Sequence, residues 1–279
     1  MKQKTLAKKG TVSGTGLFLG KPARVEFSPA DENTGITFFK NGVRLGVIGK
    51  DPLWNLTEDT ARCSAIGPAQ NRILTVEHLL AAITGFGVSN ISVDVTGDEV
   101  PAADGSAEPF VRLFKSLGLK EQLSENAVYR VREPLFFHEP AKAIAVYPAH
   151  RFEISFVMDY DHPYLRDQKA DFCVTPGIFE SQIAPARTFC TEEEAEELKN
   201  RGLGLGGTKE NNIVVCRDGS HVKDLRFKDE CVRHKVLDVI GDLGLLGFPL
   251  LGKVVAVRSG HLLNRRLVEA IRRQKENHD

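Results

Sequence analysis

Cysteine is scarce in this sequence and is not spaced for any shared site. The five cysteines, at positions 63, 173, 190, 216 and 231, are odd in number and include no Cys-x-x-Cys pair. This pattern argues against a disulfide framework and against a thiolate zinc cluster, and it is typical of proteins in a reducing cytosol. We therefore expect a cytoplasmic protein with free thiols.

The sequence also lacks an excess of charge and any long apolar run. Lysine plus arginine and aspartate plus glutamate both number 37, so no long-range field for nucleic acid is expected. No apolar segment reaches about 18 residues, so we expect no transmembrane helix. Residues 1–10 are basic without an apolar stretch, which predicts no secretion signal. Hydrophobic residues are 42% of 279, enough for one large domain or two ordinary ones.

What the sequence does contain is a helical segment, residues 233–243, with polar residues at helical spacing. His234, Asp238 and Asp242 lie four residues apart, so they share one helix face. The remaining positions are mostly apolar, as in a buried helix. A histidine and an aspartate four residues apart can bind one metal ion from one side. The alternative, equally weighted on spacing alone, is a buried helix whose polar groups bond to their neighbours.

A second polar pair interrupts an apolar helical segment in the first half of the chain. Residues 75–83 are predicted to form a helix that stops at Gly85 and Gly87, and Glu77 and His78 lie near its start. A glutamate at a partly exposed helix start would suit the helix dipole. The functional interpretation is a metal-binding histidine beside a general base. Alone, the pair does not decide between them.

The two halves of the chain repeat one order of predicted elements. In each, strands precede a histidine-bearing helix, which is followed by glycine, a strand and a second helix. We expect an internally duplicated α+β fold, with an N-terminal domain at 1–124 and a C-terminal domain at 125–279 that are joined by a linker within 122–127. A site between the halves would bring His78 to His234 and Asp238, with Glu77 and His261 nearby. Three protein ligands and one open position describe a catalytic zinc site.

Six motifs, in this order and spread over nearly the whole chain, resemble those of one enzyme family. They are TVEHL at 75–79, PAADGS at 101–106, ARTF at 186–189, RGLGLGG at 201–207, HKVLDVIGDL at 234–243 and SGHLLN at 259–264. The sequence is similar to the UDP-3-O-acyl-N-acetylglucosamine deacetylases, which are zinc amidases of lipid A biosynthesis in Gram-negative bacteria. The combination is highly specific, whereas any one motif alone would not be.

The resemblance implies a fold and a metal site. The fold is two α+β domains, each a sheet with helices, and the helices of both lie between the two sheets. Zinc binds to His78, His234 and Asp238, with iron(II) as the alternative metal. An insert around residues 187–216 builds a passage for the fatty acyl chain.

The resemblance also implies roles in catalysis. Glu77 is the base that deprotonates the attacking water, and His261 is the charged acid that assists the leaving amine. Asp242 orients His261, and Thr188 donates a hydrogen bond to the oxyanion. Lys235 and Phe189 bind the substrate, with Lys235 at its diphosphate. The reaction releases acetate from a UDP-sugar that carries a 3-O-hydroxyacyl chain, the committed step of lipid A biosynthesis.

Some alternatives stay open at this point. The same polar residues could serve a metal-independent lyase or dehydratase, or a nucleotide-lipid binding module with a structural zinc. Residues 262–273 form a basic helix, which is either a solvated face or a peripheral contact with anionic lipid. We expect a monomer. The family often has histidine in the segment 16–20, where this chain has Phe18. The motifs do not set the acyl chain length or the choice of metal.

Overall fold

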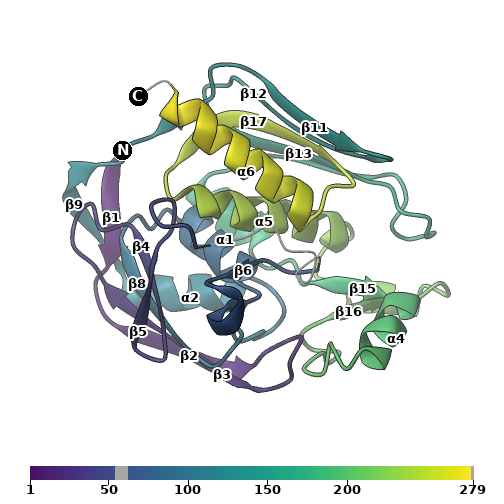
Figure 1. The fold of residues 1–279 in the computed structure, drawn as a ribbon. Coiled ribbons are helices and arrows are strands. Elements are labelled where there is room, and N and C mark those ends of the chain that lie inside the picture. The colour runs from purple at the N-terminus through teal and green to yellow at the C-terminus, as the bar shows by residue number, and fades with distance from the viewer. Residues whose placement is uncertain (54–61, 278–279) are drawn as a thin grey trace.

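Two β-sheets form the outside of the molecule, and the main helices lie between them (Figure 1). The computed structural model describes residues 1–53 and 62–277. The layers confirm the predicted α+β class and the predicted position of the helices between the sheets. The core is continuous across this middle layer, because buried apolar residues of both sheets and of the helices form one cluster.

The N-terminal sheet has the strand order β2-β3-β8-β4-β5, with β4 and β8 parallel and the other neighbours antiparallel. Asn41 and Gly42 join β4 to β5 with φ angles of 50° and 78°, the backbone that a tight hairpin turn requires. The strands are β2 (Gly10–Thr15), β3 (Pro22–Pro29), β4 (Ile36–Lys40), β5 (Val43–Val47) and β8 (Ile91–Thr96).

The C-terminal sheet repeats this arrangement strand for strand. The order of its five main strands is β11-β12-β17-β13-β14, and among these five β13 and β17 again form the parallel pair. Its strands are β11 (Leu135–Glu139), β12 (Lys142–Tyr147), β13 (Phe152–Met158), β14 (Gln168–Cys173) and β17 (Leu250–Val257), and the short β10 (Tyr129–Arg130) also pairs with β17. The duplication and the domain boundary at 124/125 stay predictions, which this shared topology supports.

The middle layer is built on α1 (Glu77–Phe86) and α5 (Glu230–Leu243). All residues of α5 except Arg233 and Lys235 are buried, including the polar face that carries His234, Asp238 and Asp242. The two helices meet backbone to backbone, because a methyl group on Gly241 would lie 2.1 Å from the carbonyl oxygen of Glu77. The helices α2 (Glu108–Leu117) and α6 (His261–Glu276) complete the layer.

One segment differs from its sequence prediction. Residues 122–125 belong to a strand, β9 (Leu119–Glu125), which pairs antiparallel with β1 (Lys2–Leu6), so the predicted linker over 122–127 is wrong for this part. The polar sequence showed no sign of this strand, because backbone hydrogen bonds to β1, rather than buried side chains, hold it in place. Leu123, for example, is 85% exposed.

Short elements surround the middle layer. The strands β15 (Phe189–Thr191) and β16 (Ile213–Val215) pair in parallel and project with α4 (Glu192–Asn200) at one side of the molecule (Figure 1). The hairpin β6 (Ala65–Ile66) and β7 (Ile73–Leu74) precedes α1, and α3 (Pro176–Ile178) follows β14. Among the described helices, none combines the length and apolarity needed to cross a membrane.

The close contact at Gly241 predicts a strong effect of a single methyl group. In Gly241→Ala, α1 and α5 must separate, which should lower the free energy of unfolding by about 1–3 kcal/mol or more. Equilibrium denaturation measures this loss. Gly177→Ala is the matched control, because a Cβ there meets no heavy atom within 4 Å. Equal stability of the two variants would contradict the packing described here.

Candidate metal centre

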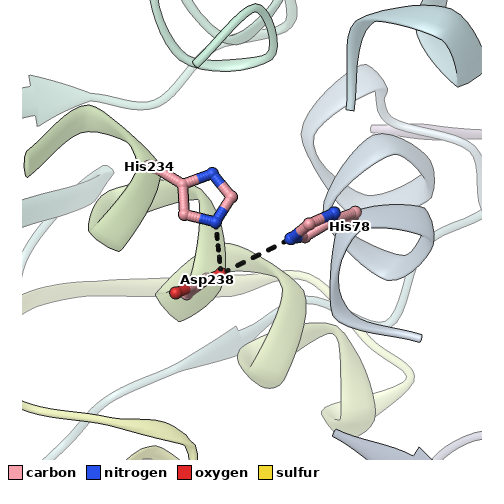
Figure 2. Close-up of side chains that lie close together, drawn as sticks. All are labelled: His78, His234 and Asp238. Carbon is pink, nitrogen blue, oxygen red and sulfur yellow. Dashed lines mark ion pairs between the residues drawn. The ribbon is translucent and has the colours of Figure 1, made fainter. Parts of the chain in front are cut away.

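Three buried side chains from the two central helices point at one another. His78 comes from α1, and His234 and Asp238 come from α5 (Figure 2). The Asp238 carboxylate oxygen Oδ1 lies 3.4 Å from Nε2 of His234 and 3.9 Å from Nε2 of His78. One ligand atom from each lies within 4.8 Å of the others, in the only such group found among the described residues. Two imidazoles and one carboxylate form a ligand set that zinc accepts.

The histidines are held in the protonation state that a metal requires. Nδ1 of His234 donates to the carbonyl oxygen of Ala186 over 3.0 Å, which leaves the Nε2 lone pair facing the centre. Burial, followed by the nearby His234, lowers the pKa of His78 to about 3. Burial also lowers the pKa of His234. Both rings are therefore neutral at pH 7 and can bind a cation without first losing a proton.

Asp238 carries the negative charge of the group. Burial alone would raise its pKa, but Lys235 and the neighbouring imidazoles hold the pKa below its usual range. The Lys235 Nζ atom donates to Asp238 Oδ2 over 2.6 Å. Lys235 follows His234 directly in the chain, and its long side chain reaches the carboxylate of Asp238 three residues further on.

Glu77 lies beside this group as a carboxylate poised near neutrality. Burial raises its pKa to about 7, against the opposing charge of His261. Its Oε2 accepts the backbone N–H of Ser64 at 2.9 Å, and its Oε1 lies 3.8 Å from Nε2 of His261. A carboxylate that gains and loses a proton near pH 7 is suited to general-base chemistry.

His261, at the start of α6, has the opposite electrostatic setting. Burial disfavours its charged form, but the charge and hydrogen bond of Asp242, with the charge of Glu77, raise its pKa to about 9. Its Nδ1 donates to Asp242 Oδ2 over 2.9 Å. Asn264 donates to the same oxygen over 2.8 Å, which fixes the fully buried carboxylate. His261 is therefore a charged acid at pH 7.

Ser64 is a member of this network that the sequence did not reveal. It is fully buried, its N–H donates to Glu77, and its hydroxyl donates to Asp242 Oδ1. It thereby joins Glu77 in the first half of the chain to Asp242, the partner of His261, in the second half. No motif or spacing marks it, because its partner Asp242 lies far along the chain.

The segment 186–189 closes one side of the centre. The Arg187 side chain forms a buried ion pair of 2.9 Å with Glu230 at the start of α5, and this anchors the segment. The Phe189 ring lies 6.3 Å from the His234 ring, centroid to centroid. The Thr188 N–H donates to Gly105 O over 2.8 Å, so its backbone is fixed. The functional roles of these residues stay predictions.

Tyr160 relates Lys235 to a second cationic group, Arg258. Burial disfavours the charged form of Lys235, but Asp238, with a smaller contribution from Tyr160, raises its pKa. The Arg258 guanidinium lies 5.6 Å from the centroid of the Tyr160 ring. Arg258 has a φ of 51°, and its buried Nε has no hydrogen-bond partner among the described residues. Buried donors are normally satisfied, so this one is available to an acceptor that enters from outside.

Comparisons with known proteins agree with the motifs. The model of the family described as UDP-3-O-acyl N-acetylglycosamine deacetylase matches residues 3–273. Curated proteins named UDP-3-O-acyl-N-acetylglucosamine deacetylase are similar over nearly the full length. That of Oleidesulfovibrio alaskensis is 40% identical, over 99% of this chain and 90% of its own. For Anaeromyxobacter sp. (strain Fw109-5) the identity is 39%, over 96% and 88%. For Wolinella succinogenes it is 34%, over 100% and 93%.

The geometry predicts tight binding of one zinc ion that depends on all three ligands. His78→Ala or Asp238→Asn should weaken zinc binding by more than the roughly 10- to 100-fold loss that follows removal of an outer-shell partner. Competition with a chromogenic chelator measures the affinity. His138→Gln, at an exposed position on β11, is the control. Unchanged affinity in the two ligand variants would place the metal elsewhere.

Proposed function

Because the chain belongs to the family of UDP-3-O-acyl N-acetylglycosamine deacetylases, we propose that it hydrolyses the N-acetyl group of UDP-3-O-(3-hydroxyacyl)-N-acetylglucosamine. The observation that carries this proposal is the convergence of His78, His234 and Asp238 beside Glu77 and His261. A structural zinc site has four protein ligands, whereas three with an open position favour catalysis over a binding module. The products are acetate and the free amine.

The proposed metal is zinc, with iron(II) as the alternative, since two imidazoles and a carboxylate suit both ions. When bound by His78, His234 and Asp238, the ion supplies a Lewis acid that polarises the acetyl carbonyl and makes water more acidic. The buried position of the three ligands excludes competing solvent and strengthens each charge interaction.

The proton transfers are assigned to Glu77 and His261. Glu77 takes a proton from the attacking water while a bond forms between the water oxygen and the acetyl carbon. His261 then gives its Nε2 proton to the amide nitrogen, and the carbon–nitrogen bond breaks. Asp242 holds the opposite ring nitrogen at 2.9 Å, so Nε2 faces Glu77 and the reacting group. The three-residue ligand group and the family of the chain, rather than this acid–base pair, favour a hydrolase over the metal-independent lyase.

The segment 186–189 is assigned to the acetyl group. We propose that the Thr188 hydroxyl donates a hydrogen bond to the developing oxyanion and that Phe189 packs against the sugar. The support is the anchoring of this segment to Glu230 and to His234, which fixes donors in place before the reaction.

The diphosphate is assigned to the cations next to the metal centre. Lys235 is 15% exposed at its side chain and can exchange Asp238 for a phosphate oxygen. Arg258 adds a donor without a partner among the described residues, and Tyr160 supplies an aromatic ring near both. An arginine and a lysine on one side of a site are a common arrangement for phosphate.

The acyl chain is assigned to the insert at residues 187–216. This region folds as β15, α4 and β16 beside the metal centre, and Leu205 in it is 63% exposed (Figure 1). Apolar side chains in a projecting segment next to the site suit a hydrocarbon chain.

We further propose a cytoplasmic monomer. One chain supplies the ligands, the base and the acid, so the site needs no second copy. The five cysteines are free, as expected in a reducing compartment. The basic C-terminal helix is explained by internal contacts: Arg265 is fully buried, Arg266 pairs with Glu139, and Arg272 donates to Gly49 O. Peripheral contact with lipid is therefore the weaker alternative.

The function and the base are tested together by acetate release. Wild-type protein with zinc should release acetate from the acylated UDP-sugar, and a chelator should abolish this. Glu77→Gln should lower kcat by about 10²- to 10⁴-fold, because general-base catalysis is lost while the shape of the side chain is kept. Zinc content, measured on the same sample, should stay unchanged. Wild-type turnover by this variant would remove Glu77 from the role of base.

The pH profile should be bell-shaped and should depend on Asp242. Glu77 must be ionised, so activity falls at low pH, and its pKa of about 7 is an upper limit beside a bound cation. His261 must be charged, so activity falls as pH rises through about 9. The negative charge of Asp242 favours the protonated imidazole. In Asp242→Asn the pKa of His261 should therefore fall, and the alkaline limb of kcat/KM should move to lower pH. An unmoved limb would contradict the pairing.

A further inference from the structure

Outside the metal centre, a buried carboxylate accepts hydrogen bonds from three neutral donors among the described residues. Glu99, 2% exposed, follows β8 and is unused in the proposed chemistry. Its Oε1 accepts the N–H of Phe18 at 2.8 Å and the hydroxyl of Thr75 at 2.9 Å. Its Oε2 accepts the N–H of Leu19 at 2.9 Å. Buried carboxylates are uncommon and are usually paired with a cation, so this arrangement is specific.

One of these partners, Thr75, lies directly before the catalytic helix. Its φ is 58°, in the left-handed region that a β-branched residue rarely adopts. The next residues are Val76, which caps α1, and then Glu77 and His78. A strained conformation persists only where its surroundings hold it. The bond from the Thr75 hydroxyl to Glu99 is such a restraint, and it sets where α1 begins.

The other partners belong to the loop 16–20. Gly16 packs directly on Glu99, because a Cβ there would lie 2.3 Å from Oε2. On its other side, the loop receives the insert: the Gly206 N–H donates to Leu17 O over 3.0 Å, and the Leu205 N–H donates to Phe18 O over 3.2 Å. Hydrogen bonds thus run without a gap from residues 205–206, through the loop and Glu99, to Thr75.

We propose that Glu99 is a positioning residue that fixes the start of α1, with Glu77 and His78, relative to the insert segment at 203–207. The link to substrate rests on the proposed function, in which the insert receives the acyl chain. When the acyl chain orders residues 203–207, the hydrogen bonds through Glu99 then also fix the positions of Glu77, the proposed base, and His78, a proposed metal ligand. Part of the acyl chain's binding energy would appear in kcat rather than in KM.

The proposal also assigns a structural role to residues 16–20, the segment that carries Phe18. This residue contributes its backbone N–H to Glu99 and its carbonyl to Leu205. Both contacts are independent of the side chain. The presence of phenylalanine, where the family often has histidine, is therefore compatible with an intact junction.

The chain contains a matched control for this junction. Glu32 accepts the N–H of Leu123 at 2.7 Å, the N–H of Ser124 at 3.1 Å and the hydroxyl of Ser124. The bonds are of the same kinds as those of Glu99, but they join a turn to β9. Glu32→Gln thus makes the same chemical change at a less buried carboxylate with the same kinds of donors, without touching Thr75 or the loop 16–20.

The experiment compares Glu99→Gln, Thr75→Val, Thr75→Ser and Glu32→Gln with wild type. Steady-state kcat and KM are measured with a long-chain and a short-chain 3-O-acyl substrate, and zinc affinity by chelator competition. Glu99→Gln and Thr75→Val should lower kcat for the long-chain substrate by about 10- to 100-fold and reduce its kcat advantage over the short chain. Both should weaken zinc binding by about tenfold or more. Thr75→Ser keeps the hydroxyl and should restore these values, and Glu32→Gln should match wild type.

Several outcomes would overturn the proposal. One is a folded Glu99→Gln protein with wild-type kcat, acyl-chain preference and zinc affinity. Another is that Thr75→Val and Thr75→Ser have equal kcat, acyl-chain preference and zinc affinity. This comparison tests the proposal even if Glu99→Gln does not fold. Absence of acetate release by the wild type would instead defeat the proposed function, and zinc affinity would still test the positioning of His78.

Discussion

The contact between α1 and α5 is the constraint on which the centre depends. His78 lies on one helix and His234 and Asp238 on the other, so their convergence requires the two backbones to approach closely. Gly241 permits that approach, because any larger residue would meet the carbonyl of Glu77. The same glycine lies between Asp238 and Asp242, so the surface that packs the helices also carries the polar groups. Packing and chemistry therefore constrain the same few residues.

Burial leads to different protonation states in groups that are only a few ångströms apart. It keeps the ligand histidines neutral, because nothing nearby compensates fully for the lost hydration. It leaves His261 charged, because Asp242 and Glu77 outweigh it. Each charge in the centre thus has a named partner: Asn264 shares Oδ2 of Asp242 with His261, and Ser64 donates to the other oxygen, Oδ1. A low-dielectric site tolerates these charges only while the network stays complete.

The sequence could predict those parts of this arrangement that a pattern of neighbouring residues marks. It could not predict those that depend on a partner far along the chain. Helical spacing marked His234 and Asp238, and the repeated order of elements predicted that His78 would lie beside them, where the structure places it. The predicted helix over 75–83 began too early, because Thr75 is held in a left-handed conformation by Glu99, a partner that spacing does not reveal. Ser64 was missed for the same reason. The strand over 122–125 escaped detection because its stability comes from backbone pairing with β1.

Glu77 and His261, which we propose as the base and the acid, come from different halves of the chain. Glu77 and His261 lie 3.8 Å apart, and each shifts the pKa of the other toward the charged form. Between pH values of about 7 and 9 the base is ionised while the acid keeps its proton. Two titratable groups with pKa values pushed apart can serve opposite roles in one turnover. Because Glu77 belongs to α1 and His261 to α6, that pH window exists only when the middle layer is assembled. Assembly of this layer therefore brings together the proposed acid–base pair and the three residues of the candidate metal centre.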